Sequence, residues 1–194
     1  MFLLTKPKIA EINNFLDRAI QTDPAYPDVG ASLAGISRSI SYNIDHNQIR
    51  IGNGEEDFER AKRAVREWKM FDFPWIELCW PDTPIEQDRN VAVLIHHFGF
   101  YSLNAARIVY TIDESDRFGF AYGTLDDHGE SGEERFSVCL DAETGNVIYD
   151  LYAFSRPNHF LAYLGYPLTR QLQKRFATDS KHAMFRAVRD NRLN

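Results

Sequence analysis

The chain has 194 residues, of which 44% are hydrophobic and 26% are charged. This length and this balance are typical of a globular protein with a sizeable core, and we expect residues 1–194 to form a single domain. The formal net charge of −6 argues against nucleic acid as a partner, because binding a polyanion needs a basic protein face. No apolar run approaches the ~20 residues of a membrane span, and the first residues lack the apolar region and the cleavage site of a signal peptide. These observations predict a cytoplasmic protein with no membrane span.

The first 51 residues predict a helix, a loop and one or two strands. Apolar residues recur at helical spacing from Ile9 to Ile20, and Thr5 is a candidate cap for this first helix. Residues 23–35 hold two prolines and two glycines without any period, which is typical of a loop. Residues 38–51 alternate apolar and polar side chains, as strands with one buried face do.

A second helix is predicted from the change of pattern at Asn53. Glu56 follows Asn53 by three residues, which is an N-cap arrangement, and the acidic residues after Gly54 favour the positive end of a helix. Phe58, Val65 and other apolar residues then form one stripe. The helix is expected to run to about Lys69.

Six strand-length runs follow this helix, and short links rich in turn-forming residues separate most of them. They span Trp75 to Trp80, Asn90 to Phe98, Tyr101 to Asp113, Arg117 to Asp126, Glu133 to Asp141, and Asn146 to Ser155. No helical segment lies between any two of them, so parallel crossovers do not fit and the sheet must be antiparallel.

The end of the chain returns to a helical period, with Pro167 opening a helix that runs to about Arg189. The predicted fold is therefore α+β, with a curved antiparallel sheet of about seven strands gripping a long C-terminal helix. The alternative is a cone-shaped α+β fold with its helices first, which is disfavoured because the longest helix comes last. The order of elements resembles the helix-grip arrangement of START-like and birch-pollen-allergen-like proteins, which leaves a cavity between sheet and helix.

Several long motifs also resemble one sequence family. They include YPDVGA at 26–31, IGNGEEDFERA at 51–61, YSLNAARIVYTID at 101–113 and FGFAYGTLDDHGESGEERF at 118–136. These stretches are similar to the uncharacterised protein family 0548, which occurs in bacteria and plants, and the resemblance extends from about Ile9 to Val188. It brings no catalytic residues to this chain, so catalytic residues stay unassigned.

Side-chain alternation along the strands suggests where a ligand would sit. Glu134 lies in line with Phe136 and Val138, and Asp150 lies in line with Tyr152 and Phe154, so either carboxylate would need a partner if its face pointed inward. We predict that the polar and aromatic residues of these strands bind the ligand: His96, Asn104, Arg107, Phe120, Tyr122, Glu134, Asp150 and Tyr152. The alternative is that the two acids are strand-end carboxylates in water or halves of structural ion pairs.

Metal and cofactor sites are not predicted. His96 and His97 are adjacent on a strand and point to opposite faces, so they cannot chelate one ion there. Gly52-Asn53-Gly54 precedes a helix, but the three acids that follow would repel a phosphate. The two cysteines, Cys79 and Cys139, are too few for a disulfide framework and are expected to be free thiols.

Three functions remain open. The first is a module that binds a small apolar or amphipathic molecule between the sheet and the last helix. The second is a cyclase-like or hydrolase-like enzyme that uses Glu134, Asp150 or His96. The third is a structural or regulatory protein whose outer strand face, at Val147, Tyr149 and Leu151, is covered by another chain. The ligand and the oligomeric state stay open.

One strand face is unusually bare. Gly119, Ala121 and Gly123 alternate between Phe118, Phe120 and Tyr122, although glycine inside a strand costs stability unless another group approaches closely. We therefore expect a helix or a neighbouring backbone to pack tightly against this bare face.

Overall fold

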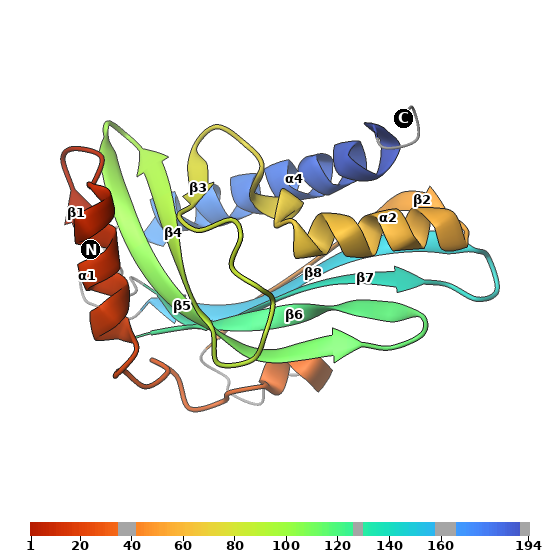
Figure 1. Cartoon of the computed structure of the whole chain (residues 1–194), viewed down its shortest axis with the longest axis horizontal. Coiled ribbons are helices and arrows are strands. Elements are labelled where there is room, and N and C mark those ends of the chain that lie inside the picture. Colours follow the sequence, from red (N-terminus) through yellow and green to blue (C-terminus); the bar gives the residue numbers. More distant parts are fainter. Residues whose placement is uncertain (35–41, 126–129, 158–165, 191–194) are drawn as a thin grey trace.

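The structure is a computed structural model that describes residues 1–34, 42–125, 130–157 and 166–190. A strongly curved sheet packs one face against two helices, and shorter elements cover parts of its other face (Figure 1). We call the face that packs against the two helices the inner face and the opposite one the outer face.

The N-terminal part supplies short elements and the first long strand. In chain order these are β1 (Phe2–Leu3), α1 (Ile9–Ala19), the 3₁₀ turn η1 (Ala31–Ala34), β2 (Asn43–Asn53), α2 (Glu55–Arg66) and a second 3₁₀ turn, η2 (Lys69–Phe71). The first part of the strand predicted at 38–51 lies outside the described residues.

The rest of the sheet comes from six consecutive strands, as predicted. They are β3 (Ile76–Leu78), β4 (Asn90–His97), β5 (Phe100–Asp113), β6 (Arg117–Thr124), β7 (Glu130–Leu140) and β8 (Asn146–Pro157). The strand order is β2-β8-β7-β6-β5-β4-β3, every pairing is antiparallel, and β1 pairs with β5 beside this path. Strands β4 to β8 follow one another over short links. Short links suffice because each strand pairs with the next one in antiparallel fashion, which needs no crossover connection.

The last helix, α4 (Tyr166–Asp190), lies along the inner face beside α2 (Figure 1). Phe176, Met184 and Val188 bury its apolar stripe in the main core, which also contains Phe120 and Phe136 from the sheet. Burial of such side chains stabilises the docked helix by about 1.5–3 kcal/mol each. Within the described ranges no helix is long and apolar enough to cross a membrane.

Two polar contacts fix the position of α4 on the rest of the core. The indole nitrogen of Trp75 donates a hydrogen bond of 2.8 Å to Asp179, and the hydroxyls of Tyr149 and Ser180 lie 2.8 Å apart. Both Trp75 and Tyr149 are buried, so these bonds satisfy polar atoms that would otherwise cost free energy.

The boundaries of the first two helices differ from those predicted. α1 begins at Ile9 with Lys8 as its cap residue, because the side chain of Glu11 accepts a hydrogen bond from the Lys8 backbone amide. Asn53 still belongs to β2, and Gly54, with a φ of 80°, is the cap of α2. A side chain at Gly54 would be strained in this left-handed conformation.

The predicted inner and outer faces of β8 were exchanged. Val147, Tyr149 and Leu151 are at most 2% exposed and form part of the inner core, so they offer no outer face for another chain. Asp150 and Tyr152 lie on the outer face instead. The alternation was read correctly, but it does not state which of two apolar-rich faces points inward.

The bare face of β6 is the outer face, and within the described ranges no helix packs on it at these glycines. A Cβ atom at Gly123 would lie 2.0 Å from the Tyr26 hydroxyl oxygen, and one at Gly119 would lie 2.2 Å from the carbonyl oxygen of Phe136. The close approach that was predicted is therefore present, but a loop tyrosine and the neighbouring strand make it.

Candidate ligand-binding cavity

A cavity of about 1050 Å³ lies between the inner face of the sheet and the first half of α4. Its wall is mostly apolar, with side chains from η2, β4, β8 and α4: Phe71, Ile95, Leu151, Leu172 and Phe176. This volume is at the upper end of the ~300–1,000 Å³ that small-molecule sites occupy. In such sites a few polar groups orient the ligand.

Glu134 and Tyr122 form one polar pair in this wall. They lie opposite each other on β7 and β6, and the Tyr122 hydroxyl donates a hydrogen bond of 2.8 Å to a Glu134 carboxylate oxygen. Among the described residues, Tyr122 is the only hydrogen-bonding partner of this carboxyl. Burial raises the pKa of Glu134 to about 8, the Tyr122 bond offsets part of the rise, and the charges of Glu130 and Asp45 add to it. Glu134 is therefore mostly protonated at neutral pH.

Glu130 brings a second carboxyl to the same wall at the start of β7. Both of its oxygens lie 2.7 Å from the donating Nε2 atom of Gln173 on α4, which also donates to Ser155 at 3.1 Å. Burial raises the pKa of Glu130 to about 7, against the lowering effect of Gln173 and of the Arg170 charge. This contact joins α4 to the sheet beside the cavity.

Asp45 of β2 faces the same region and is paired with a cation of α4. The guanidinium of Arg170 donates to both of its carboxylate oxygens, at 2.7 Å for Oδ1, and both side chains are partly buried. With its further contact to the Gln173 side-chain oxygen, the Arg170 guanidinium uses at least three of its five N–H donors within the protein.

The far end of the cavity, where β4 turns into β5, carries a neutral polar group. His97 Nε2 lies 3.1 Å from the Ser102 hydroxyl, and Asn104 donates a long hydrogen bond of 3.4 Å to the same oxygen. Burial lowers the pKa of His97, and the neighbouring His96 lowers it further. The Nδ1 atom of His97 is buried and has no hydrogen-bonding partner among the described residues.

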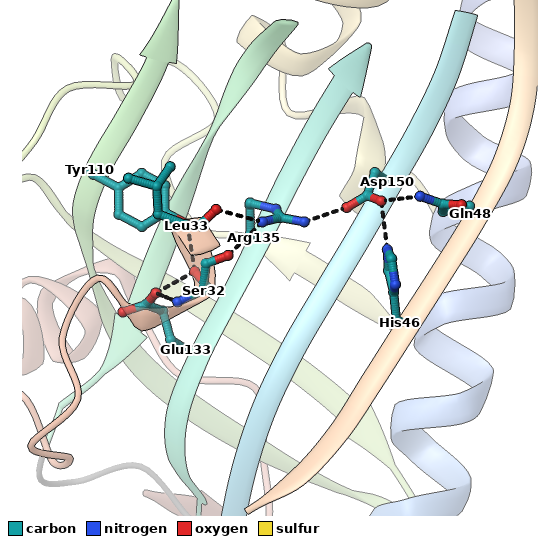
Figure 2. Close-up of polar contacts among 8 residues, drawn as sticks. All are labelled: Ser32, Leu33, His46, Gln48, Tyr110, Glu133, Arg135 and Asp150. Atoms are coloured by element: carbon teal, nitrogen blue, oxygen red, sulfur yellow. Dashed lines mark hydrogen bonds and ion pairs between the residues drawn. The ribbon is translucent and has the colours of Figure 1, made fainter. Parts of the chain in front are cut away.

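A separate polar network lies on the outer face of the sheet (Figure 2). Arg135 on β7 donates to Asp150 at 2.8 Å and to the backbone carbonyl of Ser32 in η1, and Asp150 also contacts His46 and Gln48 of β2. Burial alone would raise the pKa of Asp150, but hydrogen bonds from His46, Arg135 and Gln48 outweigh it and lower that pKa. This network fastens η1 to the sheet.

Glu133 anchors the same loop from the other side. Its carboxylate accepts hydrogen bonds from the Tyr26 hydroxyl at 2.7 Å, the Gly30 amide at 2.7 Å and the Ser32 amide at 3.0 Å, and it also contacts the Ser32 hydroxyl. The carboxylate is thus saturated with donors from the chain, which points to a structural role.

No metal site is present in the part of the chain that the structure describes, since no three His, Cys, Asp or Glu side chains come together there.

The family model described as "Domain of unknown function (DUF1990)" matches residues 25–183. The chain belongs to the DUF1990 family. Two curated relatives, both UPF0548 proteins, agree: one from Dictyostelium discoideum is 33% identical over 98% of this chain and 97% of its own length, and one from Deinococcus radiodurans is 37% identical over 97% and 99%. The resemblance found in the sequence is thereby confirmed.

Solved structures share the fold of this DUF1990 protein at low identity. Norcoclaurine synthase from Thalictrum flavum gives a TM-score of 0.52 at 11% identity, over 80% of this chain and 99% of that one. The Zhui aromatase/cyclase from Streptomyces gives a TM-score of 0.50 at 10% identity, over 79% and 96%. Together with the observed topology, these likenesses confirm the predicted helix-grip fold.

Three of the eight residues predicted to bind a ligand line the cavity of the DUF1990 protein: Asn104, Tyr122 and Glu134. Phe120 is also on the inner face, but it is fully buried between Trp68 and Phe136 below the cavity. Whether the cavity-lining residues contact a ligand stays a prediction.

The other four predicted residues face away from the cavity. His96 is exposed and stacks on Tyr101, while Asp150 and Tyr152 belong to the outer face. Arg107 donates to the carbonyl oxygens of Ala19 and Ile20 at 3.0 and 3.1 Å, so it caps the C-terminus of α1. These four residues therefore do not line this cavity, and ligand binding by them stays a prediction.

Sequence reasoning missed His97, Ser102, Glu130 and Gln173. Glu130 was assigned to a turn-rich link, whereas β7 already begins there. His97 was considered only as the neighbour of His96. Adjacent residues of a strand point to opposite faces, and the alternation did not show which of the two points inward. Ser102 and Gln173 carried no signal of their own.

Proposed function

We propose that this DUF1990 protein binds a small amphipathic molecule in the cavity between the sheet and α4. The apolar part of the ligand lies against Phe71, Leu172 and Phe176, and its polar end lies at Tyr122 and Glu134. The observation that carries this proposal is the Glu134 carboxyl, which faces a large apolar cavity with one hydrogen-bonding partner among the described residues.

The free-energy cost of that carboxyl supports a functional role. A buried carboxyl without an opposite charge destabilises a fold, and an apolar residue at the same place would remove the cost. Groups with a strongly raised pKa in a cavity are concentrated at functional sites. By contrast, the acids of the outer face are surrounded by donors and need no ligand to satisfy them.

The names of two structures that share the fold agree with a small-molecule site. The norcoclaurine synthase structure holds a transition-state analogue, and the Zhui protein is an aromatase/cyclase. At 10–11% identity these likenesses support the fold only, so neither activity is transferred to this chain.

Native mass spectrometry of protein purified from its own cells tests the proposal. The expected result is a small molecule that stays bound to the wild type and to Ala142→Phe, an exposed turn variant, but is lost from Ala153→Phe, which fills the cavity wall. In a thermal-shift screen, a ligand at a hundredfold excess over its Kd would stabilise the wild type by about 2.7 kcal/mol. Absence of a bound mass, together with no stabilisation across lipids and aromatic metabolites, contradicts the proposal.

A second candidate function is general acid–base catalysis by Glu134. Of the three groups considered for this role, only Glu134 lines the cavity, and its pKa of about 8 keeps both protonation states accessible near neutral pH. Incubation of the co-purifying ligand and related compounds with the protein, followed by mass spectrometry, tests it. Catalysis predicts turnover that Glu134→Gln abolishes while ligand binding persists; absence of turnover leaves binding as the function.

A further inference from the structure

We infer that the ligand of this cavity carries an organic cation, an ammonium group, which lies between the Glu134 carboxylate and the aromatic rings beside it. This inference rests on the proposed function, since it names the chemical class of the molecule that the same cavity binds. Three independent features of the cavity support a positive group: its charges, its aromatic rings and its proton balance.

The titratable groups beside Tyr122 are mostly acids. Glu134, Glu130 and Asp45 all contribute carboxyls to this part of the wall. The nearest cation, Arg170, is engaged on both oxygens of Asp45, and Lys174 is exposed at the rim. As Glu134 and Glu130 ionise, the potential in this apolar cavity becomes negative, which attracts a cation and repels a carboxylate or phosphate.

Aromatic rings next to Glu134 supply the second feature. Tyr122, which bonds to Glu134, has its ring 6.3 Å from Phe71, and Phe71 lies 5.6 Å from Phe176. All three rings line the cavity. A cation over ring faces is stabilised by their quadrupoles, and a carboxylate beside such rings strengthens the preference for ammonium ligands.

The third feature is a proton that the site can release. When a cation binds, Glu134 changes from COOH to COO⁻, its proton passes to the buffer, and the carboxylate pairs with the ammonium. Because the pKa of Glu134 is about 8, its ionised fraction rises about tenfold between pH 7 and pH 9, and so should the affinity for a cation. Among the described residues, the titratable groups that interact with Glu134 are Tyr122, Glu130, Asp45 and Tyr149. Arg170 acts on Glu130 and Asp45, Lys174 lines the rim of the cavity, and His97 lies at its far end.

Three phenylalkyl probes of matched length separate the possibilities: (3-phenylpropyl)trimethylammonium, 4-phenylbutan-1-ol and 4-phenylbutanoate. Isothermal titration calorimetry at pH 7 and pH 9, in buffers of different ionisation enthalpy, measures affinity and proton release together. The permanent cation does not titrate, so any pH dependence belongs to the protein. We expect it to bind most tightly and to release a proton at pH 7. Its affinity should rise about ten- to twentyfold from pH 7 to pH 9, about tenfold from Glu134 and up to twofold from Glu130.

Variants assign the effect to Glu134. Glu134→Gln should lose at least tenfold in cation affinity at pH 9 and keep only the roughly twofold pH effect that Glu130 would give with its pKa of about 7, while binding of the alcohol is unchanged. Tyr122→Phe removes a bond that lowers the pKa of Glu134, so the pH profile should shift to higher pH. Glu143→Gln, in an exposed turn, is the matched control and should behave as wild type.

The outcomes distinguish this inference from the proposed function. If the alcohol or the butanoate binds more tightly than the cation, a cationic ligand is excluded. If Glu134→Gln binds the cation normally, the placement of the cation at Glu134 is excluded. In either case small-molecule binding still stands. If none of the probes binds and no molecule co-purifies, both fail. A co-purifying molecule that holds a basic or quaternary nitrogen, displaced by the ammonium probe, supports both.

Discussion

Glu133 and Glu134 are neighbours in the chain, but they meet opposite environments because they lie on opposite faces of β7. The Glu133 carboxylate on the outer face accepts hydrogen bonds from Tyr26, Gly30 and Ser32. The Glu134 carboxyl on the inner face has Tyr122 and then the cavity. The difference teaches that a structural acid is saturated with partners from the chain, whereas an acid that faces a cavity with few partners is available to a ligand.

The pKa values of two acids express the same contrast. On the outer face, donors around Asp150 outweigh its burial and lower its pKa. On the inner face, burial of Glu134 dominates and raises its pKa. Stability should therefore depend on pH in opposite ways for the two faces.

Breaking the outer network should have the largest effect. Arg135→Met leaves Asp150 without its buried counter-ion, and both side chains are only 8% exposed. We expect a loss of about 3–5 kcal/mol in the free energy of unfolding at pH 7, measured by urea denaturation. Arg89→Met, which breaks the exposed pair with Glu86, is the control and should cost less than about 1 kcal/mol. Equal costs for the two variants would show that the outer network is not structural.

Glu134→Gln should show how much the Glu134 carboxyl lowers the free energy of unfolding at high pH. Because the folded-state pKa is raised from 4.5 to about 8, the folded protein holds its proton more tightly, and wild-type stability falls as the pH rises between these values. Gln cannot ionise, so the variant should equal the wild type near pH 5 and be about 2–4 kcal/mol more stable at pH 9.

Asp150→Asn should show the reverse pH dependence. It should destabilise the protein at neutral pH, and this loss of stability should fade as the pH drops through the lowered pKa of Asp150. If the stabilities of the two variants changed with pH in the same direction, the acids of the two faces would not differ in this way.

Gly123→Val tests how tightly the outer face is packed. The new side chain would overlap Tyr26, so we expect a cost of about 1–3 kcal/mol despite the better strand propensity of valine. Thr111→Val, at an exposed position of β5, should change stability by no more than about 0.5 kcal/mol. A neutral or stabilising Gly123→Val would mean that the loop around Tyr26 does not pack against β6.

The smallest effect is expected at the exposed end of the outer network. His46 lies 2.7 Å from Asp150, but its side chain is 48% exposed, and Arg135 and Gln48 also bind that carboxylate. His46→Gln should therefore cost less than about 1 kcal/mol at pH 8 by the same denaturation assay. A cost as large as that of Arg135→Met would place the centre of the network at His46 instead.

Part of the cavity wall followed from pattern alone, at a place where two strands pair. Tyr122 and Glu134 were both selected because each lies in an alternating run, and the cross-strand register then brings them into contact. Glu130 and Gln173 could not be found in this way, because their contact joins a strand start to a helix more than forty residues later. No periodic pattern in the sequence indicates a contact of this kind.

The sequence by itself determined the order of the elements, the antiparallel pairing and the long last helix, because these depend on local periodicity and on the length of the links. Only the tertiary structure decided which face of each strand became the cavity wall. In β8, Val147, Tyr149 and Leu151 and the opposite set around Tyr152 are both rich in apolar atoms, because α2 and α4 cover one side of the sheet while α1 and the loop with Tyr26 and η1 cover parts of the other. Alternation separates two faces but does not orient them, so the roles of Asp150 and Glu134 were settled by what packs on each side.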